Sequence, residues 1–264
     1  MKSLPWVDFT RRNDPAHPFG PVLLQKSLDR YGAYVFCFWT KNPGTVADLY
    51  RNQISQMMSK DTLVLAQVTL NNYSSIMEPG VPSFNTRYQG LDRLLRLIGG
   101  PGHIKLRIDP IILGYTTPNM IRTSLEAGRS LGIRRFVMNF LVPSYKGVGN
   151  ILIHRGLIRP NDLTPSQERI LSTARFVSEE AQRVGAILQV CAESNWIGQH
   201  VSGIQIASCS DPTWATQVRP ELTGIFKANP SRKDCGCCYS ADWGVYASRG
   251  GYVCPGGCLY CYAQ

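Results

Sequence analysis

Residues 103–142 read HIKLRIDPIILGYTTPNMIRTSLEAGRSLGIRRFVMNFLV. Two apolar runs, residues 103–112 and 135–142, flank a stretch at 118–131 that begins with a proline and is followed by Gly132, as helices commonly are. Runs that are apolar almost throughout are typical of parallel strands covered on both faces. A strand, a helix and a second parallel strand make a βαβ unit. The stretch therefore predicts a parallel α/β fold.

The same alternation extends along most of the chain. Six strands are expected at residues 6–10, 33–39, 63–70, 103–112, 135–142 and 186–191, with helices at residues 21–31, 45–60, 86–98, 118–131 and 165–184. Six strands at this regular spacing favour a partial (β/α)6 TIM-like barrel. An open doubly wound sheet is the alternative, but no Gly-x-Gly-x-x-Gly follows the first strand. We expect residues 1–192 to form the barrel, with a long linker at 142–163, and residues 193–264 to form a cysteine-rich cap on the same domain.

The cap ends in Cys254-Pro-Gly-Gly-Cys258-Leu-Tyr260-Cys261, which is C-x3-C-x2-C with a tyrosine before the third thiol. Protein-bound 4Fe–4S clusters normally take four cysteines. Three thiolates from one short loop can hold three corners of such a cluster and leave its fourth iron open to a small molecule. A zinc ribbon is the alternative, because Cys235 and Cys237 could join Cys258 and Cys261 as four ligands. That arrangement would leave Cys254 without a role.

A second metal centre is expected from Cys191, Cys209, Cys235 and Cys237. Four thiolates can ligate a second 4Fe–4S cluster or close a structural zinc site. Cys238 competes with its neighbour Cys237, and the four thiols could also be unconnected, since sequence separation hides whether they converge.

Composition and charge favour an intracellular protein with a polyanionic partner. The formal net charge is +10, which a DNA, RNA or nucleotide substrate would explain, although basic residues are scattered and could serve solubility alone. Arg11, Arg12, Arg134 and Arg135 are the first candidates for phosphate contacts. The opening residues lack the pattern of a signal peptide, and no apolar run reaches the ~18 residues of a membrane span. We therefore expect a cytoplasmic location, away from the membrane, with metal-binding or redox thiols.

Polar residues near the carboxyl ends of the expected strands are the candidate site. Parallel α/β barrels place their chemistry at these ends. The candidate catalytic residues are Lys41, Arg107, Asp109 and Glu193, and the candidate cofactor contacts at these ends are Lys41, Asn42 and Asn139. Arg107 and Asp109 lie two residues apart on a strand and so face the same side, which also fits a structural ion pair.

The cysteine spacing resembles the signature of the radical S-adenosylmethionine superfamily. Several blocks resemble a bacterial and phage family with this motif at its carboxyl end: 11–15 (RRNDP), 38–43 (FWTKNP), 107–112 (RIDPII), 191–193 (CAE), 235–237 (CGC), 240–246 (SADWGVY) and 254–263. The block at 107–110 is also similar to one in the spore photoproduct lyase branch, which repairs a DNA lesion. Asn13 and Trp243 depart from the family pattern, outside the cysteine loop.

The resemblance implies a 4Fe–4S cluster on Cys254, Cys258 and Cys261, whose open iron binds S-adenosylmethionine. It implies that Tyr260 lies near the adenine and that Lys41 and Asn42 contact the cofactor's amino or carboxylate group. The predicted function is a radical enzyme that modifies or repairs a nucleic acid base or nucleotide, supplied with electrons by a flavodoxin or ferredoxin. The alternatives are a zinc-stapled, non-catalytic nucleic-acid-binding protein and a radical enzyme acting on a peptide or small metabolite.

Overall fold

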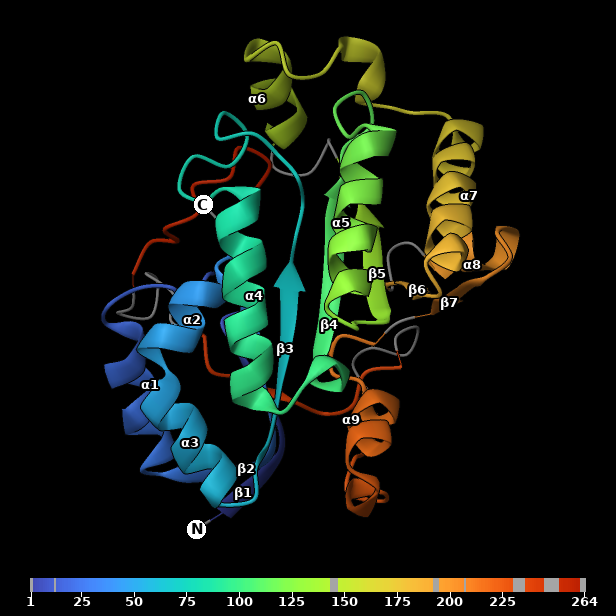
Figure 1. Ribbon diagram of the computed structural model, residues 1–264. Coiled ribbons are helices and arrows are strands. Elements are labelled where there is room, and N and C mark those ends of the chain that lie inside the picture. The colour runs from blue at the N-terminus through green and yellow to red at the C-terminus, as the bar shows by residue number, and fades with distance from the viewer. Residues whose placement is uncertain are drawn as a thin grey trace. The chain divides into compact units, whose positions relative to one another are not determined.

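The computed structural model describes residues 2–11, 13–142, 147–191, 195–206, 208–229, 236–244 and 252–261 (Figure 1). The strands are β1 (Lys2–Phe9), β2 (Tyr31–Thr40), β3 (Leu63–Thr69), β4 (Ile104–Ile111), β5 (Arg135–Phe140), β6 (Ile187–Val190), β7 (Ile204–Ile206) and β8 (Ala241–Asp242). The α-helices are α1 (Gly20–Leu28), α2 (Pro43–Leu49), α3 (Arg51–Ser59), α4 (Phe84–Ile98), α5 (Pro118–Ser130), α6 (Val148–His154), α7 (Gln167–Arg183), α8 (Asn195–His200) and α9 (Pro212–Val218). Short 3-10 helices are η1 (Pro101–His103), η3 (Pro160–Asp162) and η5 (Pro220–Leu222).

The chain forms two compact units, and each draws on separate stretches of sequence. The first unit comprises Met1–Val68, Asn85–Lys105 and Ser208–Pro255. The second unit comprises Thr69–Phe84, Leu106–Ala207 and Gly256–Gln264. Each unit therefore contains residues from both sides of residue 192.

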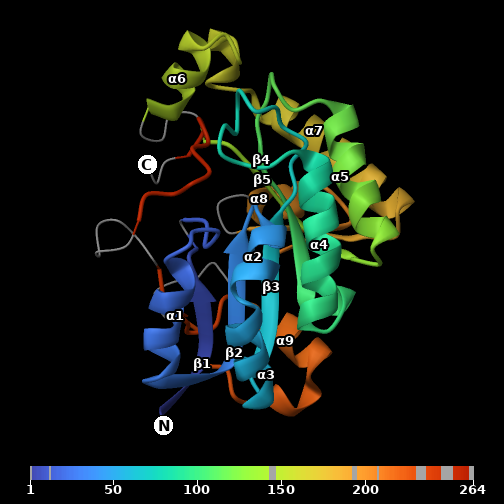
Figure 2. The same cartoon turned by 60° about the vertical axis from the view of Figure 1, so that its left-hand side comes forward.

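The first unit is built on parallel strands in the order β8-β1-β2-β3. Helices connect consecutive strands, so the strands all run in one direction (Figure 2). One face of these strands carries an aromatic group in which Phe9, Phe36 and Phe38 contact Tyr50, the residue between α2 and α3. This packing holds the junction of α2 and α3 against the strands.

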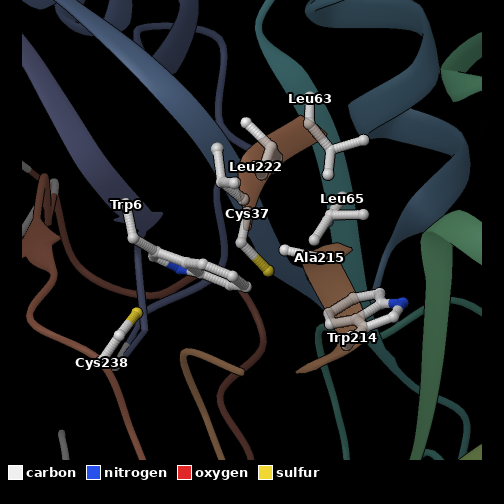
Figure 3. Packing of buried hydrophobic residues seen from close by; sticks show 9 residues of the cluster. Trp6, Cys37, Leu63, Leu65, Trp214, Ala215, Leu222 and Cys238 are labelled. Atoms are coloured by element: carbon white, nitrogen blue, oxygen red, sulfur yellow. The ribbon is translucent and has the colours of Figure 1, made fainter. Parts of the chain in front are cut away.

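The opposite face of the first unit packs on α9 and the segment before β8. Trp6, Cys37 and Leu65 project from β1, β2 and β3 toward Trp214 of α9 (Figure 3). All of these side chains are buried, and Cys238 completes the group beside Trp6. Alternate residues along β1–β3 therefore serve two cores, as expected of strands covered on both faces.

The second unit contains parallel strands in the order β4-β5-β6-β7. Helices α5 and α7 pack against each other, and α7 packs on β6 (Figure 1). On α5, a Cβ atom at Gly128 would lie 2.3 Å from the Phe136 ring. Glycine at this position is what lets α5 approach β5 so closely.

The predicted class, a parallel α/β fold, is confirmed. Among the described residues no pairing closes either set of strands into a barrel. The helix expected at 45–60 is two helices, which meet at Tyr50. The linker expected at 142–163 contains α6, whose Val148 and Leu152 are buried. Strands β7 and β8 were not predicted, because runs of three and two residues carry no readable pattern.

None of the described helices combines the length and the apolar character that crossing a membrane requires.

Candidate functional site

The second unit gathers polar side chains around the carboxylate of Asp109, near the carboxyl end of β4. Arg107 donates from Nε to Asp109 Oδ2 over 3.1 Å, and its Nη2 donates to the same oxygen. Asn139 of β5 donates from Nδ2 to this oxygen over 3.2 Å. One carboxylate oxygen therefore accepts three N–H bonds, which fixes the orientation of the group.

Two asparagines tie this carboxylate to neighbouring strand ends. Asn71, which follows β3, accepts from Asp109 N and donates to Asp109 O, both over 3.1 Å. The Oδ1 atom of Asn139 accepts from Cys191 N over 3.2 Å, at the end of β6. The structure thus brings together four residues that the sequence singled out, namely Arg107, Asp109, Asn139 and Cys191. Asn71 joins them.

The second oxygen of Asp109 is available to a ligand. The Arg107 side chain is 8% exposed and that of Asp109 is 25% exposed. The described residues provide no partner for Oδ1 of Asp109. A fixed acceptor at the end of a parallel strand can bind a hydroxyl, amide or ammonium group of a small molecule.

The cysteine loop, defined here as residues 256–261, also belongs to the second unit. Cys261 N donates to Cys258 O over 3.0 Å, which closes a turn, and Gly257 has a φ of +54° that favours glycine. Cys258 is buried, whereas Cys261 is half-buried. Thiol donors on a glycine-containing turn fit a metal–thiolate centre in chemical type. Within the described ranges no three His, Cys, Asp or Glu side chains are grouped as metal ligands, so ligation remains a prediction from the spacing.

Tyr260 is the buried aromatic residue of this loop. Its side chain is 6% exposed, and its hydroxyl donates to Oε1 of Glu78, a residue that the sequence analysis missed. Burial raises the pKa of Tyr260 far above its ordinary value, and the nearby charges of Glu78 and Cys258 add to the effect. The phenol is therefore a proton donor at neutral pH. An adenine contact by Tyr260 stays a prediction.

Lys41 and Asn42 lie in the first unit and take part in local structure there. Asn42 caps α2, with Oδ1 accepting from Thr45 N over 3.3 Å. The backbone N of Lys41 donates to Asp14 over 2.6 Å, and Thr40 Oγ1 donates to Asp14 over 2.9 Å. Burial raises the pKa of Asp14, although these hydrogen bonds oppose the rise. Contacts of Lys41 and Asn42 with a cofactor stay a prediction.

A second buried carboxylate, Asp8 on β1, organises the other face of the first unit. Its Oδ1 accepts from the indole nitrogens of Trp6 and Trp39 over 3.0 and 2.9 Å. Its Oδ2 accepts from Ser210 over 2.9 Å and from Arg11. Burial lowers the pKa of Arg11, but the charges of Asp8 and Cys209 outweigh it and hold the pKa above the ordinary value. An acidic residue inside an apolar strand was the signal that could have revealed this network.

Cys209 and Cys237, two of the four residues expected in a second centre, are neighbours in this network. Cys209 N donates to Cys237 Sγ over 3.2 Å, and Cys238 N donates to Ser210 O over 2.9 Å. Burial, followed by the charge of Asp8, raises the pKa of Cys238 to about 12, so this thiol stays protonated. Cys237 is therefore the better ligand candidate of the two. Cys191 lies in the second unit, and Cys235 and Glu193 fall outside the described residues.

The chain belongs to the family described as "Domain of unknown function (DUF1848)", whose model matches residues 16–263. No curated protein matches the chain.

Solved structures match the chain only at low identity and low TM-score. The carboxyl transferase domain of Rhizobium etli pyruvate carboxylase is 13% identical, with a TM-score of 0.40 over 81% of this chain and 33% of that one. The mannanase catalytic domain from Streptomyces sp. SirexAA-E is 10% identical, with a TM-score of 0.40 over 92% of this chain and 75% of that one. The present chain thus spans a third of the length of the carboxyl transferase. At these TM-scores the likenesses assign no activity to the chain.

The Arg107–Asp109 pair yields a test of the site's construction. Arg107→Met removes the charged donor, so we expect the free energy of unfolding to fall by about 2 kcal/mol, less than for a fully buried pair because Asp109 is partly exposed. The double variant Arg107→Met/Asp109→Asn should recover part of this loss. Urea unfolding of the metal-free protein measures both.

The matched control is Arg122→Gln, which breaks a surface ion pair with Glu180 and should cost below about 1 kcal/mol. If the loss of unfolding free energy in the double variant equals the sum of the losses in Arg107→Met and Asp109→Asn measured singly, the two side chains are not coupled.

Proposed function

We propose that the chain is a radical S-adenosylmethionine enzyme whose cysteine loop and Asp109 carboxylate serve one reaction site. One observation carries the proposal: residues 71–80 contact both. Asn71 brackets the backbone of Asp109, while Met77 O and Gly80 N hydrogen-bond to the cysteine loop, each over 3.0 Å. This segment follows β3, at the carboxyl end of the strands where parallel α/β proteins bind their ligands.

The chemistry would come from a 4Fe–4S cluster held by Cys254, Cys258 and Cys261, which when bound supplies one electron to the sulfonium of S-adenosylmethionine and so cleaves a carbon–sulfur bond. The remaining tasks fall to the protein. Cys258 packs among apolar side chains that include Met77, Ile112 and Val148. Such packing excludes water and oxygen from a reactive centre.

Asp109 has the properties of a group that orients the cofactor or the substrate. Arg107 and Asn139 hold one of its oxygens, so the other can accept from a ribose hydroxyl or an ammonium group without rearrangement. Arg107 donates two N–H bonds to Asp109 and acts as its positioning partner. Glu193 and Lys41 remain proposed contributors on the basis of the sequence blocks alone.

A nucleic acid base or nucleotide is the proposed substrate, and a flavodoxin or ferredoxin the proposed electron donor. The basic excess of +10 supports a polyanionic substrate, although individual arginines are paired with acidic residues. Arg175 and Arg183 on α7 pair with Glu168 and Glu126. Arg134 precedes β5 and so lies at the amino end of the strands, away from Asp109. Arg155 and Arg159 are exposed beyond the carboxyl end of β5, after α6, and are the better candidates for phosphate contacts.

A second metal–thiolate centre on Cys191, Cys209, Cys235 and Cys237 is the remaining proposal. Its support is the N–H···S bond between Cys209 and Cys237 beside the Arg11 guanidinium, whose positive charge stabilises thiolates. A structural zinc ion and a second 4Fe–4S cluster both suit these donors.

Replacing Cys258 by alanine tests the proposed centre. We expect Cys258→Ala to lose the brown colour and broad absorbance near ~400 nm that this cluster gives the anaerobically reconstituted protein, because thiolate-to-iron charge transfer needs the cluster. Release of 5′-deoxyadenosine from S-adenosylmethionine should fall to background. Cys37→Ala is the control, since Cys37 is fully buried in the first unit's core, and it should keep both signals. Unchanged cleavage by Cys258→Ala would contradict the proposal.

Binding to single-stranded DNA or RNA at increasing salt tests the substrate class. If Arg155 and Arg159 contact phosphates, replacing both with glutamine should reduce the slope of log affinity against log salt by about 1–2. Arg134→Gln, at the opposite ends of the strands, should leave the slope unchanged. Binding that does not depend on salt, or an equal effect of Arg134→Gln, would rule out this arrangement.

A further inference from the structure

Three contacts hold the cysteine loop to the turn formed by residues 74–81. Leu259 N donates to Met77 O and Gly80 N donates to Gly256 O, each over 3.0 Å. Between these two backbone bonds the Tyr260 hydroxyl donates to Glu78 Oε1. Both segments belong to the second unit, so all three contacts lie within one compact body.

The middle contact places an acidic side chain under a loop that carries two thiols. Glu78 is 2% exposed, and Cys258 is 5% exposed. Burying a carboxylate costs several kcal/mol unless hydrogen bonds compensate, and an apolar side chain would pack there without that cost. A carboxylate at this position therefore calls for a role that packing alone does not supply.

Tyr260 extends the connection toward the Asp109 site. Its ring meets the ring of Tyr73 edge to face, with centroids 6.0 Å apart. The hydroxyl of Tyr73 donates to Pro110 O over 2.6 Å, directly after Asp109. Glu78, Tyr260 and Tyr73 thus form a continuous set of contacts from beneath the cysteine loop to the end of β4.

We propose that Glu78 is a positioning residue that holds the cysteine loop in place before any metal binds, and that it sets a fixed negative charge beside the metal–thiolate centre. The anchoring role stands on the contacts alone, whereas the charge role rests on the proposed function. Net charge around an iron–sulfur cluster is one of the factors that set its reduction potential. A negative charge beside the centre disfavours the added electron, so it makes the reduced centre a stronger reductant.

Amide hydrogen exchange in the metal-free protein tests the anchor. Tyr260→Phe removes only the hydroxyl, and Glu78→Ala removes the acceptor. We expect either change to speed exchange at the Leu259 amide at least about tenfold, because the loop opens locally once its anchor is lost. Glu78→Gln keeps an oxygen acceptor for the phenol and should stay near wild type. Tyr34→Phe and Glu221→Gln, at exposed positions in the first unit, are the controls.

The reduction potential of the reconstituted protein tests the charge. Glu78→Gln should bind as much iron as wild type and show a midpoint potential shifted to more positive values. A merely structural role would leave the potential of this variant unchanged.

Wild-type exchange in both Tyr260→Phe and Glu78→Ala would overturn the anchor. An unchanged or more negative potential in Glu78→Gln would overturn the charge role. If wild type takes up no iron, the proposed function and the charge role fail together, while the exchange result still decides the anchor.

Discussion

The hydrogen bonds between residues 77–80 and the cysteine loop fix the end of the chain at the end of the strands. Two backbone bonds and the Tyr260–Glu78 contact direct the loop to the segment that follows β3. The same segment carries Asn71, which orients Asp109. The proposed reaction site depends on residues 71–80 contacting both Asp109 and the cysteine loop.

Buried carboxylates recur at the polar positions of both units, and each is matched to its donors. Asp8 accepts from two indoles, a serine and an arginine, and Asp14 accepts from a hydroxyl and backbone amides. Asp109 differs because only one of its oxygens is committed to the described residues. Both oxygens of Asp8 and of Asp14 accept hydrogen bonds, which indicates structural groups, since a buried polar group without partners is costly. Because its other oxygen has no partner among the described residues, we propose Asp109 as the group that meets a ligand.

The sequence predicted the fold class because apolar runs of strand length alternate with capped helices throughout the first 191 residues. It also singled out Arg107, Asp109, Asn139 and Cys191, which the structure brings together because the ends of neighbouring parallel strands converge, while their roles stay predictions. It could not identify Glu78, because its partner Tyr260 is distant in sequence and turn residues carry no periodic signal. It also did not foresee that Asn42 caps a helix, because an asparagine after a strand fits a cap and a ligand contact equally well.

Electron–nuclear double resonance on the reduced, reconstituted protein tests the central claim most directly. S-adenosylmethionine labelled with ¹⁷O in its carboxylate is added to protein with known iron, sulfide and zinc content. A 4Fe–4S cluster with three cysteine ligands has an open iron, so the account predicts hyperfine coupling between the label and the cluster. A fully ligated cluster that shows no coupling, or a colourless protein containing zinc alone, would contradict it.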